Sequence, residues 1–164
     1  MADFSGRSCD FGFCGVAISD RHVERAGDER RPHCRSALRG VLKAHQDWVT
    51  SIAFSPDGRW FATSGDDHAV VVWDSVSLEK VLELRQHQWA VVSATFSPDG
   101  QLLASTSGGS QGRTIVWETR TWKKKHEFPL SFTRGNLIFS ANSRRLWASS
   151  TQQVWDLDTG VELA

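Results

Sequence analysis

The chain has 164 residues, of which 40% are hydrophobic and 23% are charged. A chain of this length and composition folds around a sizeable core, which excludes an intrinsically disordered protein. Nineteen basic residues balance nineteen acidic ones, and this neutrality supplies no general attraction to nucleic acid or to an anionic membrane. No apolar run approaches the ~20 residues of a transmembrane helix, so we expect neither a membrane nor a nucleic-acid partner.

The first 36 residues mix arginines with acidic side chains and hold no sustained apolar face. We predict an irregular N-terminal extension over residues 1–36. The start has neither the basic residues nor the clean apolar run of a secretory signal, and we expect a cytoplasmic protein. The cysteine and histidine spacing in this segment matches no usual pair of zinc ligands, so we interpret the cysteines as unpaired thiols and expect no metal site. The residues concerned are Cys9, Cys14, His22, His33 and Cys34.

Internal repetition dominates the rest of the chain. The motif FSPDG occurs at residues 54–58 and again at 96–100, and a weaker copy, FSANS, begins at Phe139. His45 and His87 each stand nine residues before the phenylalanine of a motif. The three phenylalanines are followed after 19, 21 and 16 residues by Trp73, Trp117 and Trp155. Independent markers in phase at about 42 residues indicate a repeat protein.

Each period contains the pattern of four short strands. In the first, Ile52 and Phe54 stand two apart and share one face of a strand. Proline and glycine of the following PDG favour a tight turn. The next runs are a second strand, an apolar strand covered on both faces, and a fourth strand after a further turn. We predict strands over 49–55, 60–64, 69–73 and 80–84, and we expect Trp60 and Trp147 in second strands to be buried.

These motifs resemble those of the tryptophan–aspartate (WD) repeat family. The matching residues are Ala44-His45, FSPDG, Asp67 six residues before Trp73, and the closing pairs Trp73-Asp74, Trp117-Glu118 and Trp155-Asp156. The resemblance implies an all-β fold, namely a partial, open β-propeller of three four-stranded antiparallel blades. The three WD-type repeats fall within residues 37–164, at about 37–74, 79–118 and 122–156.

The resemblance also implies a buried hydrogen-bond chain inside each blade. In the first unit it joins His45, Thr63, Asp67 and Trp73, which otherwise suggest a nucleophilic triad. We prefer the structural interpretation, because a buried imidazole and indole need hydrogen-bond partners, and we expect no catalytic residue. The second unit keeps His87, Ser105 and Trp117 but has Gln111 at the aspartate position. The third keeps Trp155, with Leu130 and Ala148 at the histidine and hydroxyl positions.

The loops on one rim of such a fold carry candidate binding residues. Trp48 and Trp89 follow the two histidines, and exposed tryptophan is a common anchor of protein interfaces. Packing of each tryptophan against a neighbouring blade is the alternative. With Asp66 and with Arg113 in the bend 107–113, these are the candidate rim residues. We expect other proteins or peptides as partners, and neither a cofactor nor a small-molecule substrate.

Three blades are fewer than the four to eight of a closed propeller. Each end blade would expose an apolar face, at a cost on the order of 10 kcal/mol if several hundred Å² stay uncovered. We therefore predict an interaction scaffold that is a fragment of a longer propeller. Self-association of two copies into a ring is an alternative that covers the same faces. The alternative function is a regulatory or sensory part of a larger signalling enzyme, a kinase or NTPase whose catalytic domain lies elsewhere.

Overall fold

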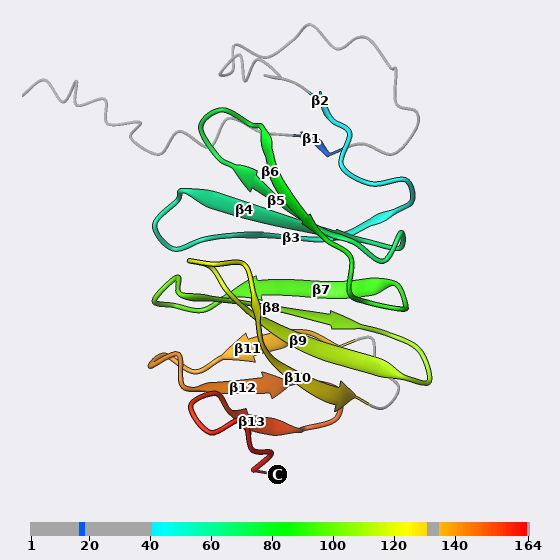
Figure 1. Cartoon of the computed structure of the whole chain (residues 1–164). Helices are drawn as coiled ribbons and strands as arrows, with labels where there is room; N and C mark the ends of the chain where they lie inside the picture. The colour runs from blue at the N-terminus through cyan, green and yellow to red at the C-terminus, as the bar shows by residue number, and fades with distance from the viewer. Residues whose placement is uncertain (1–16, 19–40, 131–134, 164) are drawn as a thin grey trace, which may run out of the picture. The chain divides into compact units, whose positions relative to one another are not determined.

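The computed structural model describes residues 17–18, 41–130 and 135–163. The chain forms two units, Met1–Lys43 and Ala44–Ala164. In the first, β1 (Ala17–Ile18) pairs in parallel with β2 (Val41–Leu42). The rest of the predicted extension, including all three cysteines, lies outside the described residues. The second unit contains three separate antiparallel sheets and no helix among the residues described (Figure 1), and no described segment is a helix able to cross a bilayer.

Blade 1 is a four-stranded sheet in which neighbours in sequence are neighbours in space. Its strands are β3 (Val49–Phe54), β4 (Trp60–Gly65), β5 (Val70–Asp74) and β6 (Lys80–Leu84). Blade 2 repeats this order with β7 (Val91–Phe96), β8 (Leu102–Ser107), β9 (Gly112–Glu118) and β10 (Lys124–Leu130). The register repeats as well, because Trp73 pairs with Phe61 in blade 1 and Trp117 with Leu103 in blade 2. The two periods of the sequence therefore form the same sheet.

Blade 3 has three strands among the described residues, where four were expected. They are β11 (Leu137–Phe139), β12 (Arg145–Ala148) and β13 (Val154–Asp156). At the place of the fourth strand the chain makes only two strand-like contacts. The Asp156 amide donates to the Val161 carbonyl at 2.9 Å, and Trp155 forms an isolated bridge with Glu162. In blade 2 the Glu118 amide makes the corresponding bond to the carbonyl of Lys123, the residue before β10.

The turn between the first two strands uses the same device in every blade. The Ser55 hydroxyl donates to the Asp57 carboxylate at 2.6 Å, and Gly58 takes a φ of +69° that side chains disfavour. Ser97, Asp99 and Gly100 repeat this arrangement. In blade 3 the Ser140 hydroxyl donates to Asn142, and Ser143 adopts the positive φ. FSANS is thus a degenerate copy that still folds into the same turn.

The blades stack face to face (Figure 1), and their buried side chains form two cores. Strand β8 is buried along its whole length because its two faces contribute side chains to the two different cores. Leu103 packs toward blade 1, while Leu102 and Ala104 pack toward blade 3. Polar contacts add to this packing, since the Thr50 hydroxyl donates to the Val91 carbonyl and His126 Nε2 donates to the Leu157 carbonyl at 2.9 Å. Each blade thus depends on its neighbours for burial.

The two outer faces of this stack expose apolar side chains. Ile52 of blade 1 is 45% exposed, whereas its counterpart Ala94 in blade 2 is 4% exposed. On the outer face of blade 3, Ile138 is 54% and Trp147 is 36% exposed. The expectation that Trp147 is buried is therefore wrong: its side chain lies on the face that no fourth blade covers. The propeller is open.

Candidate functional site

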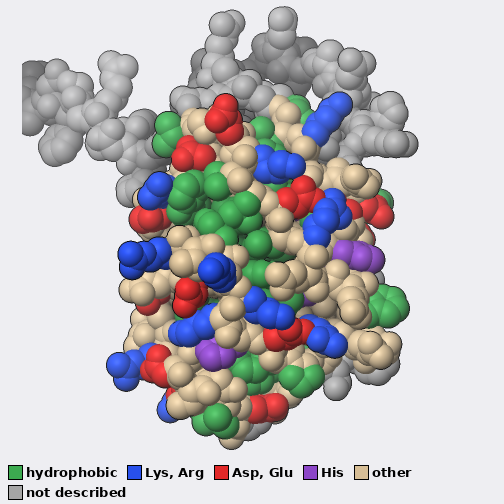
Figure 2. Space-filling view, in the orientation of Figure 1, with side chains coloured by type: hydrophobic (Ala, Val, Ile, Leu, Met, Phe, Trp, Pro, Cys, Tyr) green, Lys and Arg blue, Asp and Glu red, His purple; other side chains and the backbone are tan. Residues whose placement is uncertain are grey.

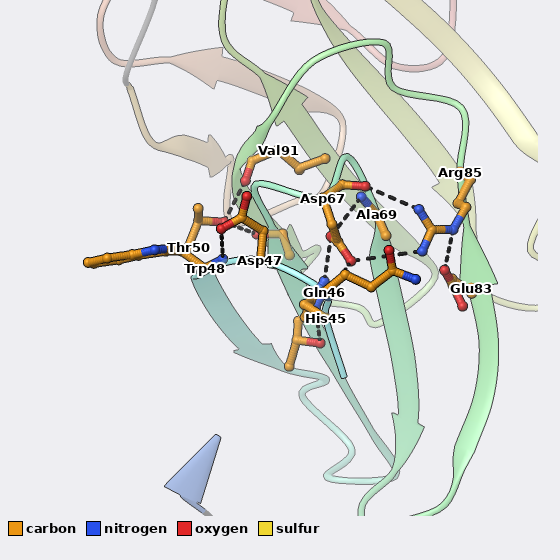
Figure 3. Close-up of polar contacts among 12 residues, drawn as sticks. His45, Gln46, Asp47, Trp48, Thr50, Asp67, Ala69, Glu83, Arg85 and Val91 are labelled. Carbon is orange, nitrogen blue, oxygen red and sulfur yellow. Dashed lines mark hydrogen bonds and ion pairs between the residues drawn. The ribbon is translucent and has the colours of Figure 1, made fainter. Parts of the chain in front are cut away.

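A hydrogen-bond chain runs through the interior of blade 1. His45 Nδ1 lies 2.8 Å from Asp67 Oδ1, and His45 Nε2 lies 2.9 Å from the Thr63 hydroxyl oxygen. The Trp73 indole donates to the same hydroxyl at 3.1 Å. Asp67 also accepts the Gln46 amide and lies 3.8 Å from Arg85, as Figure 3 shows. The four residues named from the sequence are thus one connected set that links the loop before β3 to β4, β5 and the bend between them.

Asp67 titrates below its ordinary range in this setting. Burial alone raises its pKa, but the hydrogen bonds from His45 and from the Gln46 amide outweigh that effect and leave the pKa lowered. Gly65 makes room for the pair, because a β-carbon at this position would lie 2.6 Å from His45 Nδ1. The His45–Asp67 contact is therefore built by the backbone as well as by the two side chains.

Blade 2 contains only part of this chain. His87 Nε2 lies 2.8 Å from the Ser105 hydroxyl oxygen, which also accepts the Trp117 indole N–H at 2.9 Å. His87 Nδ1 is buried without a hydrogen-bond partner, in keeping with glutamine at position 111 in a bend two residues longer. Burial lowers the pKa of His87 to about 4, so the ring is neutral at pH 7.

In blade 3 the polar chain is replaced by apolar contact. Leu130 and Ala148 are both buried in the second core. The Trp155 indole N–H is buried without a partner, and its ring stacks on Phe128 at a centroid distance of 5.0 Å. The interior network is therefore complete in blade 1, partial in blade 2 and absent in blade 3.

A groove crosses one rim of the stack. It has a volume of about 800 Å³ and is bounded by the loops that lead into β3, β7 and β11, with the two bends after β4 and β8. We call it the rim groove and define it by its lining residues Trp48, Thr50, Asp66, Trp89, Gly109 and Asn136, with their neighbours in the same loops. Three of the four candidate rim residues therefore line one cavity, although they lie up to 41 positions apart in sequence.

The two tryptophans of the rim groove differ in how much of each ring is exposed and in what the ring packs against. Trp48 is 73% exposed, and Figure 3 shows its ring pointing away from the His45–Asp67 pair. Trp89 is 44% exposed and packs on the bend of its own blade, where a β-carbon at Gly109 would come within 3.0 Å of the ring. The alternative expected from the sequence, packing against a neighbouring blade, does not describe the exposed Trp48 ring.

Arg113 lies apart from the other three candidates. It follows the first residue of β9, and its guanidinium pairs with Glu127 on the adjacent strand β10. Both residues line a different cavity of about 600 Å³. The side chain points across the sheet because cross-strand pairing sets its direction. The structure instead brings Gly108 of the same predicted bend into the rim groove, together with Thr50 of β3 and Asn136 just before β11. Neither Thr50 nor Asn136 is among the candidates predicted from the sequence.

Charges of both signs are interspersed on the face of the molecule in Figure 2. Within the described part of the chain, no group of three or more histidine, cysteine or acidic side chains is arranged to hold a metal ion. The cysteine and histidine set of residues 9–34 lies outside that part.

Two segments, residues 36–74 and 78–118, match the family model described as "WD domain, G-beta repeat". The chain belongs to the WD-repeat family. The first segment contains β3, β4 and β5 of blade 1, and the second contains β6 of blade 1 followed by β7, β8 and β9 of blade 2. The third repeat is found by its geometry, since its turns and register follow those of the other two.

The chain spans only part of the length of the proteins that it matches. The small ribosomal subunit protein RACK1 of Caenorhabditis elegans is 32% identical over 123 residues, which cover 73% of this chain and 37% of that protein. Protein HIR1 of Candida albicans is 42% identical over 45 residues, or 27% of this chain and 4% of its own length. The solved structure of the RRP9 WD40 repeats superposes with a TM-score of 0.68 at 20% identity, covering 75% of this chain and 39% of that one. The chain thus spans about two fifths or less of each, and the structural match shows the fold.

Proposed function

We propose that the chain is a non-catalytic scaffold that binds other proteins or peptides through the rim groove. The observation that carries this proposal is the groove itself, in which Trp48 and Trp89 stay exposed and Asp66 lines the same cavity. Tryptophan is strongly enriched among residues that dominate the binding energy of protein interfaces. Exposing a large indole to water costs free energy, and that free energy is regained only when a partner covers the ring.

The internal network supports the non-catalytic part of the proposal. A nucleophile and its base must reach a substrate, whereas Thr63 is fully buried and its hydroxyl oxygen already contacts both His45 and Trp73. Both ring nitrogens of His45 are likewise engaged. The groups that resemble a triad therefore satisfy one another inside the blade.

We further propose that the three blades are one section of a larger propeller supplied by a longer polypeptide. The exposed Ile52 face of blade 1 corresponds to the face of blade 2 that packs on blade 1. The exposed Ile138 face of blade 3 stands where blade 2 packs on blade 3. The relatives that the chain matches in part have the additional length such a ring requires.

Site-specific photo-crosslinking tests the scaffold proposal. A photoreactive amino acid placed at position 48 or 89 of the full chain in its native cells should give discrete protein adducts, because both side chains line the rim groove. The matched control is position 76: Val76 is 89% exposed but lies in the turn after β5, at the opposite ends of the strands. Trp89→Ala should remove the adducts formed at position 48.

Equal adducts at positions 48, 89 and 76 would show general surface stickiness and would contradict the proposal. Adducts at position 48 that survive Trp89→Ala would also contradict it, since the two side chains would then not serve one site.

A further inference from the structure

We propose that the rim groove recognises a protein segment carrying a lysine or arginine side chain, with Asp66 as the counter-ion. The inference rests on the proposed binding role of the groove and adds the chemistry of its partner. Among the described residues that line the groove, Asp66 is the one that carries a charge. The described lining of the groove is therefore acidic, in a chain whose overall charge is zero.

Asp66 forms no ion pair with a basic side chain in the described part of the chain. Its side chain makes no hydrogen bond or ion pair with another described residue, and its backbone amide donates to the Trp48 carbonyl at 2.9 Å, which holds it beside that loop. Asp47 precedes Trp48 and accepts the Trp48 backbone N–H at 2.8 Å. The Trp48 backbone is thus hydrogen-bonded to two aspartates, and neither carboxylate pairs with a described basic side chain.

Arg85, a basic residue near this bend, is already paired with groups other than Asp66. Arg85 donates to the Asp67 carbonyl at 3.1 Å, lies 3.8 Å from the Asp67 carboxylate and pairs with Glu83 (Figure 3). Asp67 itself is occupied by His45 and the Gln46 amide. The two neighbouring carboxylates of this bend therefore have different roles. Asp67 is hydrogen-bonded inside blade 1, whereas Asp66 lines the groove and can pair with a cationic ligand.

The aromatic rings of the groove suit the same ligand. A cation over a tryptophan face is attracted by the ring quadrupole, and arginine is the residue found there most often. The chain already contains this pairing, since the Arg59 guanidinium lies 4.4 Å from the centre of the Trp60 ring. Trp48 and Trp89 offer exposed ring surface in the groove without such a partner among the described residues.

The charge of the groove decides between two classes of macromolecule. A nucleic acid requires basic side chains to neutralise its phosphates, and the part of the lining that the structure describes contains none. A cationic protein segment instead gains attraction from Asp66 and apolar contact from both indoles. The groove also runs past three loops, which gives an extended segment room to contact all of them.

Selection of a random heptapeptide library on the immobilised full chain tests this proposal. The selected peptides should be enriched in lysine or arginine, and fluorescence anisotropy should detect their binding. Asp66→Asn, which keeps the shape, should weaken binding about three- to fivefold, as for an exposed ion pair. Trp89→Ala should weaken it about tenfold or more. Glu79→Gln is the matched control, because it removes the same charge at the opposite rim.

Peptides without basic enrichment, a failure to select any peptide, or equal effects of Asp66→Asn and Glu79→Gln would overturn the cationic ligand. Those outcomes are distinct from failure of the scaffold proposal, which the adducts at positions 48 and 89 decide. Protein adducts together with neutral or acidic selected peptides would leave the scaffold standing and reject this inference.

Discussion

Replacing Trp117 with alanine should lower the free energy of unfolding by about 3–5 kcal/mol, the range for removing a large buried aromatic side chain. Trp117 is fully buried in the core between blades 1 and 2. Its indole N–H also donates to the Ser105 hydroxyl. The truncation therefore opens a cavity between two sheets and removes one bond of the blade 2 network. Urea unfolding followed by far-UV circular dichroism, at one protein concentration, measures the change.

Two variants separate packing from general loss of tryptophan. Trp117→Phe keeps most of the ring but not the N–H donor, so its effect should be clearly smaller than that of alanine. Trp48→Ala removes an indole that is largely exposed and should change stability by less than about 0.5 kcal/mol. Similar losses for Trp48→Ala and Trp117→Ala would contradict the assignment of one to the rim and the other to the core.

Stability should fall as the pH drops from about 6.5 to about 4, because of His87. Burial lowers the pKa of this histidine to about 4 in the folded chain, while an unfolded histidine titrates near 6.5. Below about 6.5 the unfolded state takes up a proton that the folded state refuses until about pH 4, so unfolding becomes progressively more favourable over that interval. The difference corresponds to about 3 kcal/mol at 1.36 kcal/mol per pH unit. Below about pH 4 this contribution stops changing.

The measurement is a series of urea unfolding curves between pH 7 and pH 4 on the parent chain and on His87→Gln. The variant has no titrating ring at this position, and its amide can still reach Ser105. Most of the decrease should therefore disappear in the variant. Identical slopes in the two proteins would mean that His87 does not carry the effect. Asp67 contributes separately: its lowered pKa gives stability that is lost only as the pH falls through and below the ordinary aspartate range.

Local signals in the sequence were sufficient to predict the strands. The expected strand 80–84 coincides with β6, the strands expected at 49–55 and 60–64 differ from β3 and β4 by one residue at one end, and the strand expected at 69–73 is shifted by one residue from β5. Turn-forming residues mark the boundaries of these segments, with PDG before β4 and polar residues before β5. Residues that lie in phase, such as Trp73 and Trp117, also occupy the same register in the two sheets. Repetition made each assignment support the next.

Features that depend on neighbouring sheets were beyond the sequence. Trp147 alternates with Leu146 and Ala148, which are buried, and only the missing neighbour of blade 3 makes it exposed. Arg113 was grouped with the rim from its place in a bend, but strand pairing directs it to Glu127. The floor of the rim groove is made of loops from three blades, so it exists only after the sheets stack.

The central physical claim is that these sheets are stable when stacked, and that both outer faces of the stack require cover. Multi-angle light scattering of the purified chain over a wide range of concentrations tests it most directly. We expect a mass above that of a single chain, because the Ile52 and Ile138 faces of different copies cover each other, and a return toward single-chain mass in Ile52→Glu. A stable single chain at every concentration would contradict the claim.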